Sequence, residues 1–474
     1  MKKLALAALI AVPAAAYPLA TWMAGKTVEE NLAAQYRQLE ANPYLKVVKR
    51  DYQRGFYRST ETVTFELFDP LEAALAEGEE IKPLRLTLRT DILHGPLPGL
   101  ETFAAATSET ELVLDDAILA RFSEISGGQK PLAVHSVYRF DGSGQAEVSS
   151  PAFSVTVPTG EERPAGKLVW EGMRFQMDFD SDMSHYNFAG GAPGLRFEGE
   201  DGSSVVMRDL KIDAVQTRPF ADVPMFYTGP TKMSVAEVSV REVGEEADMV
   251  RLGRMSLEGQ IPMQGDYLDV LSRIGIEQVD VGGDSYGPVH YDVSLRHLHA
   301  RSVASLYGAF MKLSSHPGGD DAAEQMAAAM SGPAMELMRH DPEFSLDRIS
   351  FMTPDGESRL SVSVRLNGAQ EEDFANPLML LAKLDAKAEA RLPEELLLLA
   401  AILDESETLA PGWGLLESQG FIQREGDMLS VNARYAQGQL SLNGKPFDPM
   451  AFSTVISPET EASLEDEASL EDEE

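Results

Sequence analysis

Ser285 lies in a short pattern that could form a hydrolase nucleophile. The residues Gly283-Asp284-Ser285-Tyr286-Gly287 match G-x-S-x-G, the pattern of a nucleophile elbow, which requires a strand before the serine and a helix after it. A strand-like segment, Ile276 to Val281, precedes the pattern, but apolar and polar residues alternate from Val289 to Leu295 and predict a second strand. We therefore interpret the pattern as a glycine-rich hairpin loop and expect Ser285→Ala to change only the stability of the turn.

Two histidines have a spacing that could bind a metal ion. His297 and His299 are two positions apart in a predicted strand, which places both imidazoles on one face. No third ligand follows at a fixed spacing, because the remaining histidines are scattered: His94, His135, His185, His290, His316 and His340. We expect a pair of surface imidazoles near a strand end and no metal site.

The carboxylates Asp178, Asp180 and Asp182 begin like a calcium-binding loop. An EF-hand would have Gly in the place of Met183 and Glu in the place of Ala189, and the chain has neither. We interpret the segment as the edge of a strand and an acidic turn, at which weak, unspecific binding of divalent ions stays open.

The remaining patterns do not predict catalysis. The sequence has no Gly-x-x-x-x-Gly-Lys-Ser/Thr phosphate loop, and Gly142-Ser143-Gly144 precedes no predicted helix. Acidic residues are so frequent that no pair is distinguished as a general acid and base. A methionine-rich stripe favours core packing over an adaptable surface for a lipid or partner: Met326, Met330, Met335 and Met338. We predict no catalytic residue, no cofactor and no metal.

Most of the chain from about residue 45 onward has the period-two pattern of half-buried strands. One polar face per strand indicates antiparallel sheets with one wet side, and glycine-rich turns between the runs indicate hairpins. The clearest alternating runs are Thr62–Leu67, Leu84–Arg89, Met173–Phe179, Leu360–Leu366 and Leu384–Leu392. A final hairpin is predicted from Leu429–Tyr435 and Leu440–Leu442, with its turn at Gln437-Gly438.

Helices are predicted later in the chain. Val303, Leu306, Tyr307 and Phe310 have the spacing of an amphipathic helix. Residues 320–340 are rich in Ala and Met and predict a helix that breaks near Gly332-Pro333. Pro393 predicts the start of another helix, which continues through Leu403.

The N-terminus predicts export across a membrane. Lys2 and Lys3 precede an uncharged run from Leu4 to Met23, which is long enough as a helix to cross a hydrocarbon core of roughly 30 Å. Positive charge lies ahead of the run, so the N-terminus is expected in the cytoplasm and the rest of the chain on the other side of the membrane. A cleaved signal peptide, ending at Ala14-Ala15-Ala16, is the alternative. We favour an uncleaved anchor because the apolar run continues to Trp22.

Composition excludes several classes of protein. The chain of 474 residues has no cysteine, which excludes disulfides, thiolate catalysis and a cysteine-linked lipid anchor. Its net charge of -36 repels phosphate backbones and anionic lipids, so we expect no nucleic-acid partner. Residues Glu459–Glu474 contain a duplicated Glu-Ala-Ser-Leu-Glu-Asp and predict a disordered acidic tail.

Several segments, in this order, resemble the YdgA-like family of Gram-negative envelope proteins, whose function is uncharacterised. They are Thr21–Lys26 (TWMAGK), Tyr52–Ser59 (YQRGFYRS), His94–Pro98 (HGPLP), Leu384–Lys387 (LDAK) and Tyr435–Gly444 (YAQGQLSLNG). The resemblance covers about residues 1–447. It implies an anchored, periplasm-facing protein and supplies no catalytic residues. Read physically, the segments suit turns: His94 can hydrogen-bond a nearby carbonyl at a strand end.

The fold class that follows is mainly β (α+β), with an N-terminal membrane anchor, a large twisted and curled antiparallel sheet, and a helical portion near 300–410. The predicted regions are an anchor or signal segment (1–26), a β-rich exported region (27–300), a helix-containing region with interspersed strands (301–410), a C-terminal hairpin (411–450) and a disordered acidic tail (451–474).

Three functional hypotheses remain from the sequence. The first is a non-enzymatic inner-membrane protein, with its bulk in the periplasm, that binds a lipid or other apolar ligand in a curved sheet groove or scaffolds an envelope protein. The second is a hydrolase at Ser285 or a metal site at His297 and His299. The third is a structural spacer without a ligand.

Overall fold

The computed structural model describes residues 2–39, 42, 44–68, 83–160, 164–242, 249–314, 322–396 and 409–448. The chain divides into two compact units. Unit 1 comprises residues 1–266, 280–284 and 300–334, and unit 2 comprises residues 267–279, 285–299 and 335–474. Antiparallel strands make up most of both units, which confirms the prediction of a mainly β protein.

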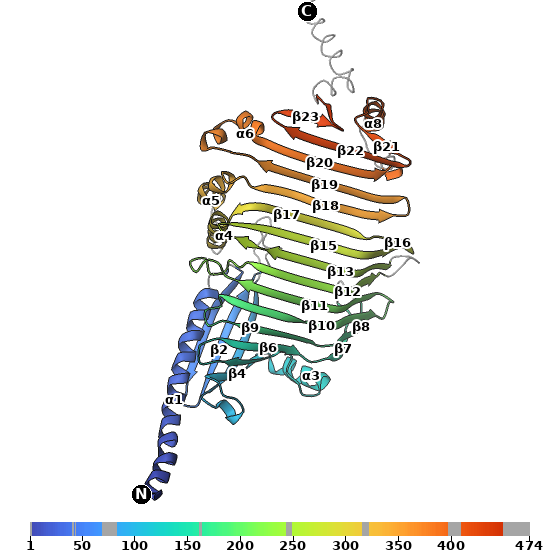
Figure 1. The fold of residues 1–474 in the computed structure, drawn as a ribbon. Helices are drawn as coiled ribbons and strands as arrows, with labels where there is room; N and C mark the ends of the chain where they lie inside the picture. Colours follow the sequence, from blue (N-terminus) through green and yellow to red (C-terminus); the bar gives the residue numbers. More distant parts are fainter. Residues whose placement is uncertain are drawn as a thin grey trace, which may run out of the picture. The chain divides into compact units, whose positions relative to one another are not determined.

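Unit 1 is an antiparallel sheet in which most strands pair with their neighbours in sequence (Figure 1). Along the sheet the strands are β1 (Leu45–Arg54), β2 (Arg58–Leu67), β3 (Leu84–His94), β4 (Ala106–Leu112), β5 (Ala133–Tyr138), β6 (Gly144–Ser150), β9 (Met173–Phe179), β10 (His185–Gly199), β11 (Ser204–Thr217), β12 (Gly229–Arg241) and β13 (Met249–Ile261). The long β10 pairs with β9 along its first half and with β8 (Gly166–Trp170) along its second half, and β8 pairs with β7 (Phe153–Val157). The short β14 (Met263–Gln264) follows β13.

Unit 2 is also an antiparallel sheet. Its strands in order are β15 (Tyr267–Val281), β17 (Val289–His299), β18 (Glu343–Thr353), β19 (Gly356–Leu366), β20 (Leu384–Pro393) and β22 (Met428–Ala436). The short strands β21 (Gln423–Glu425) and β23 (Gln439–Leu442) pair with opposite ends of β22, and β24 (Lys445–Pro446) pairs with β23. The predicted C-terminal hairpin is confirmed, with Gln437 and Gly438 at positive φ in its turn.

The helices are α1 (Lys2–Leu39), α3 (Asp116–Ser126), α4 (Ala300–Ser314), α5 (Ala322–Met338), α6 (Pro377–Lys383) and α8 (Leu409–Ser418), with short 3₁₀ turns at Pro98–Leu100 and Glu371–Ala375. The predicted break at Gly332-Pro333 is wrong, because α5 continues through Pro333. Pro333 cannot donate to the carbonyl of Ala329, four residues earlier, and Ala329 is exposed, so water can satisfy that carbonyl. Of the helix predicted from Pro393, residues 394–396 are helical and 397–403 lie outside the described residues. The acidic tail also lies outside them.

One face of the unit 1 sheet is largely apolar because apolar residues recur at alternate positions of its strands and neighbouring strands are in register. One cross-strand row contains Ile92, Ser108, Ser136, Ala146, Met177, Phe188, Ala214 and Thr231. The adjacent row contains His94, Ala106, Tyr138, Gly144, Phe179, Tyr186 and Gln216. We call the side of the sheet that carries these two rows the apolar face.

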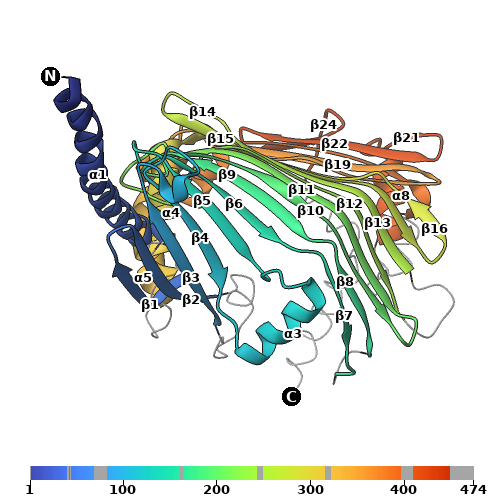
Figure 2. The same ribbon diagram turned by 90° about the horizontal axis from the view of Figure 1, so that it is seen from below.

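Helix α1 packs on part of this apolar face (Figures 1 and 2). Val28 and Leu32 form a buried cluster with Ile92 of β3 and Ala106 of β4, and Tyr36 packs against it. The helix therefore extends beyond residue 26, where the predicted anchor ended, to Leu39. In the part of the chain that the structure describes, no helix combines the length and apolarity needed to span a membrane.

Candidate apolar binding site

Beyond α1, the apolar face continues across β9–β12 and forms a cavity of about 680 Å³. Its floor consists of side chains from both cross-strand rows, and its walls come from two other segments. One wall is the end of α1, through Gln35 and Leu39, and the other is the loop between β11 and β12, through Met225 and Tyr227. The remaining lining residues are Met177, Met183, Tyr186, Phe188, Ile212, Ala214, Gln216 and Thr231.

The loop that forms one wall is held in place by α4. Phe226 is buried and its ring lies 5.6 Å from that of Tyr307 in α4. Arg301, in the first turn of the same helix, donates to the carboxylate of Asp222 at 2.9 Å. The cavity wall therefore has a fixed support and is not a free loop.

The cavity is electrically neutral. None of its lining residues is Asp, Glu, Lys, Arg or His. Burial raises the pKa of Tyr186 and of Tyr227, so both phenols stay protonated at neutral pH. Two polar side chains of the lining have local partners: the Tyr227 hydroxyl donates to the carbonyl of Met183 at 2.9 Å, and the Gln216 amide donates to Thr231 Oγ1 at 2.9 Å. A neutral cavity of this size suits an uncharged, apolar group.

Two further cavities lie in unit 1. One, of about 540 Å³, is lined by apolar side chains of β8 and β10–β12, among them Leu168, Phe197, Val205 and Val240, and also by the charged residues Asp201, Arg241 and Glu242. The other, of about 790 Å³, includes charged side chains: Glu171, Arg174, Asp209, Lys211, Asp213, Lys232 and Glu258. Lys211 and Asp213 flank Ile212 in β11, so alternation directs them away from the apolar face. The larger cavity therefore lacks the neutral lining of the first.

Three of the segments that resemble the YdgA-like family meet where α1 docks on the sheet. Arg54 of β1 donates to the carbonyl of Trp22 at 2.9 Å, and its guanidinium lies 5.1 Å from the centre of the Trp22 ring system. His94, at the end of β3, lies against Gly25 of α1. The segments thus share a structural role, which is to position the helix that forms one cavity wall.

His94 is held at both ring nitrogens. Its Nδ1 donates to the carbonyl of Phe56 at 3.0 Å, as the sequence predicted for a nearby carbonyl. Its Nε2 accepts from the Ser59 hydroxyl at 2.9 Å. Burial lowers the pKa of His94, so the ring is neutral at pH 7. The pair of Ser59 and His94 has the elements of a nucleophile and base, but both are buried, at 1% and 3% exposure, and cannot meet a substrate.

A buried ion pair lies beneath the same helix. Glu61 of β2 is 1% exposed and accepts from Arg50 Nε at 2.6 Å and from the Tyr36 hydroxyl at 3.0 Å. Burial and the neighbouring carboxylate raise the pKa of Tyr36, which keeps its hydroxyl a donor. The contact connects α1 to β1 and β2.

The structure places Ser285 in a short hairpin strand, directly after the turn at Gly282-Gly283. β16 (Asp284–Tyr286) is followed by β17 and not by a helix, and Gly282 and Gly283 have positive φ, as glycines in tight turns do. Ser285 is exposed, and its hydroxyl accepts from the Gln278 amide at 3.4 Å. The predicted glycine-rich hairpin is confirmed, but Ser285 lies in the strand after the turn and not in the turn itself. A strand follows this serine where a nucleophile elbow would have a helix.

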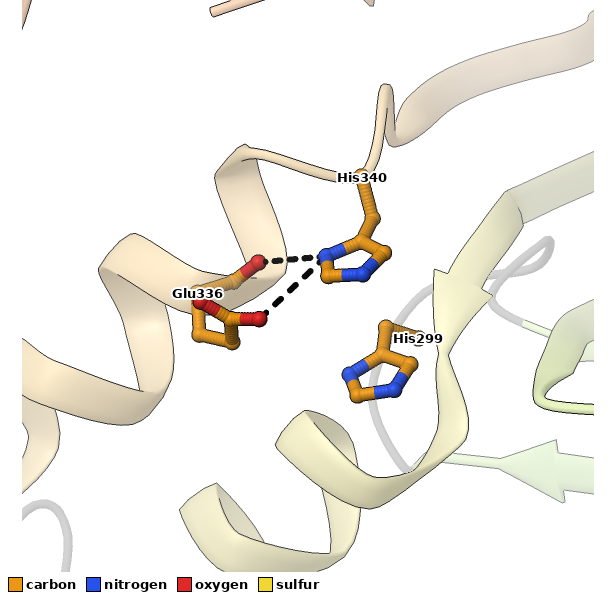
Figure 3. A group of neighbouring side chains, drawn as sticks. All are labelled: His299, Glu336 and His340. Atoms are coloured by element: carbon orange, nitrogen blue, oxygen red, sulfur yellow. Dashed lines mark hydrogen bonds and ion pairs between the residues drawn. The ribbon is translucent and has the colours of Figure 1, made fainter. Parts of the chain in front are cut away.

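The two candidate metal ligands, His297 and His299, have different partners. His297 has a φ of +55°, which interrupts the regular alternation of β17, and its ring stacks on Tyr267 at 4.2 Å. The ring of His299 stacks on His340 at 4.2 Å, with Glu336 beside it (Figure 3). The expected isolated pair of imidazoles is therefore replaced by a group that includes residues from α5 and the turn after it. Glu336 and His340 are four positions apart at a helix end, and this spacing is the signal in the sequence that the two side chains are neighbours.

Asp178 lies in β9, and Asp180 and Asp182 lie in the turn between β9 and β10. Asp180 donates its backbone N–H to the His185 carbonyl at 3.0 Å, and Asp182 accepts from Arg218 at 2.9 Å. This geometry confirms the prediction of a strand edge and acidic turn.

Most cavity residues were not singled out from the sequence. Alternation in the sequence predicts which strand residues face the cavity floor. It does not predict the wall residues, because Gln35 and Leu39 lie in α1 and Met225 and Tyr227 lie in a loop. A signal for the helix was present, because Val28, Leu32 and Tyr36 repeat every four residues after the predicted anchor. The aromatic residues around position 226 were the corresponding signal for the loop.

Comparison with models of protein families matches residues 1–450, which include every element of the described fold. The search of curated proteins gives no match, and neither does the search of solved structures.

Proposed function

Because the chain belongs to the family described as a bacterial protein of unknown function (DUF945), we propose a function from the geometry of the site: a membrane-anchored, periplasm-facing envelope protein, YdgA-like and non-enzymatic, that binds an acyl chain of a lipid on the apolar face of unit 1. The observation that carries this proposal is the neutral cavity of about 680 Å³, walled on one side by α1.

The shape and lining of the cavity favour an acyl chain. Binding sites for small molecules are concave and mostly apolar, with volumes of roughly 300–1,000 Å³. Aromatic and methionine side chains line the cavity, and these pack against irregular apolar groups. The net charge of -36 opposes an anionic head group near the rim, so a zwitterionic phospholipid is the expected ligand.

The link between α1 and the cavity favours a membrane source for that lipid. The uncharged run Leu4–Met23 and the cavity residues Gln35 and Leu39 belong to one helix. At about 1.5 Å per residue, the cavity lies roughly 24 Å from the end of that run. A lipid-binding surface at this distance would face the bilayer in which the run is anchored.

The proposal is tested by identifying lipids that co-purify with the full chain in mild detergent. Ile212→Asp places a carboxylate in the cavity and is expected to remove the lipid, because burying a charge against an acyl chain is unfavourable. Lys211→Asp introduces the same residue one position away on the polar side of β11 and is expected to keep it. Equal lipid content in both variants, or no lipid in the parent protein, would contradict lipid binding and favour the structural spacer.

The anchor has its own test. If the run Leu4–Met23 is retained, the protein resists extraction from inner membranes with carbonate. A mature N-terminus at Tyr17 would show cleavage and a soluble exported protein.

A further inference from the structure

Three of the eight histidines of the chain gather at one place in unit 2. His297 and His299 are at the end of β17, and His340 follows the end of α5. The rings of His299 and His340 are nearly parallel, with an angle of 6° and centres 4.2 Å apart. Tyr267 stacks on His297 and borders both other rings, at 6.2 and 6.0 Å. None of these residues lines the apolar cavity of unit 1.

Three side chains of this group have the donor atoms of a transition-metal site. His299, Glu336 and His340 each contribute one ligand atom, and these atoms lie within 4.8 Å of one another (Figure 3). Two imidazole nitrogens and one carboxylate oxygen form a donor set found at zinc sites that keep a position open for water or another ligand. Glu336 and His340 come from one helix end, so a single additional contact to β17 completes the set.

Hydrogen bonds already orient the rings. His340 Nδ1 lies 2.9 Å from the carbonyl oxygen of Glu336, and because a carbonyl only accepts, Nδ1 carries the proton and Nε2 keeps its lone pair. His297 Nδ1 donates to the His340 carbonyl at 2.8 Å, and the His297 N–H donates to Asp269 at 2.8 Å. Contacts of this kind fix ligand rings at metal sites.

We propose that His299, Glu336 and His340 bind one zinc ion, which joins the C-terminal end of α5 to the end of β17. The lone pairs of two parallel rings do not converge, so binding requires one imidazole to tilt away from its neighbour. Solvent can reach the site, since the side chains of Glu336 and His340 are 46% and 26% exposed. Without the ion, the Glu336 carboxylate lies 3.9 Å from His340. With the ion bound, both side chains coordinate it instead.

The test measures binding of Zn²⁺ alone to the full chain, after chelation and dialysis, by calorimetry. We expect one equivalent of zinc, and binding at least tenfold weaker in His299→Gln, His340→Gln and Glu336→Gln. His185→Gln is the matched control, because His185 is a half-buried residue of β10 in unit 1 and its Nδ1 lies 3.0 Å from Thr217 Oγ1.

Spectroscopy with Co²⁺ in place of Zn²⁺ gives a second readout. The visible bands of a tetrahedral ion with two nitrogen ligands are expected in the parent protein and in His185→Gln, and are lost in the ligand variants. If a histidine variant does not fold, Glu336→Gln provides the test, because the Glu336 side chain is exposed and glutamine has nearly the same shape as glutamate. Equal binding by the parent and Glu336→Gln, or binding lost equally in His185→Gln, would overturn the proposal and indicate an adventitious ion only.

Discussion

The imidazole of His94 occupies the space into which a side chain at position 25 would project. A Cβ built on Gly25 would lie 2.5 Å from Nδ1 and 2.6 Å from Cε1 of His94. The ring cannot move aside easily, because Ser59 and Phe56 bind its two nitrogens. Close approach of α1 to the end of β3 therefore requires glycine at position 25.

Gly25→Ala is expected to destabilise the protein by about 1–3 kcal/mol, because an added methyl group must displace a buried, hydrogen-bonded ring. Chemical denaturation of the full chain measures the change. Gly332→Ala, in the exposed part of α5 with no atom near the new Cβ, is the control and should gain about 0.5–1 kcal/mol. Equal effects of the two substitutions would show that α1 does not dock on His94.

The buried His94 predicts a pH dependence of stability. Burial lowers the pKa of His94 in the folded state, so the unfolded state binds more protons once the pH falls below about 6.5. The free energy of unfolding should therefore decrease from pH 7 toward pH 5, and the slope should be smaller in His94→Gln. An unchanged slope in His94→Gln would refute this assignment.

The buried pair of Arg50 and Glu61 beneath α1 predicts a large loss of stability when its charge is removed. Glu61→Gln leaves the Arg50 guanidinium without its carboxylate, and breaking such a buried pair costs about 3–5 kcal/mol. Arg50 is 25% exposed, so we expect the lower end of this range. Glu258→Gln, which removes the partner of Lys232 in an exposed pair, should cost less than about 1 kcal/mol in the same denaturation experiment. A loss below 1 kcal/mol for Glu61→Gln would mean that the pair is not desolvated.

Phe175 distinguishes a binding face from an ordinary core. Its ring is half-buried and stacks on Phe188, with centres 5.2 Å apart. Phe175→Asp should abolish lipid retention while lowering stability by about 1–3 kcal/mol, since it loses an aromatic pair and part of a buried side chain. Gln176→Asp adds the same carboxylate on the polar side and should retain lipid. Complete loss of folding in Phe175→Asp would show that Phe175 belongs to a sealed core.

Local patterns predicted the strands well. The alternation of Leu384, Ala386, Ala388, Ala390 and Leu392 overrides a helix-like composition, and the segment is β20. Alternation succeeds here because one face of the strand is half-buried and the other is exposed, and a repeat of two residues is the pattern that this difference produces.

The contacts between distant segments could not be predicted in the same way. Gly25 and His94 are 69 positions apart, and neither residue type identifies its partner. The group of His299, Glu336 and His340 depends on where α5 ends relative to β17, which the predicted break at Pro333 had placed incorrectly. Tertiary packing also set the length of α1, whose second half is helical because Val28 and Leu32 are buried on the sheet.

The most direct test of lipid binding is photo-cross-linking in the membrane. The full chain is expressed in cells or vesicles that contain phosphatidylethanolamine with a diazirine in its acyl chain, irradiated, digested and analysed by mass spectrometry. We predict cross-links in peptides that contain Met177–Phe188 and Ile212–Thr231, and their loss in Ile212→Asp but not in Lys211→Asp. Cross-links confined to residues 4–23 would contradict the account, because they would show a lipid contact of the anchor alone.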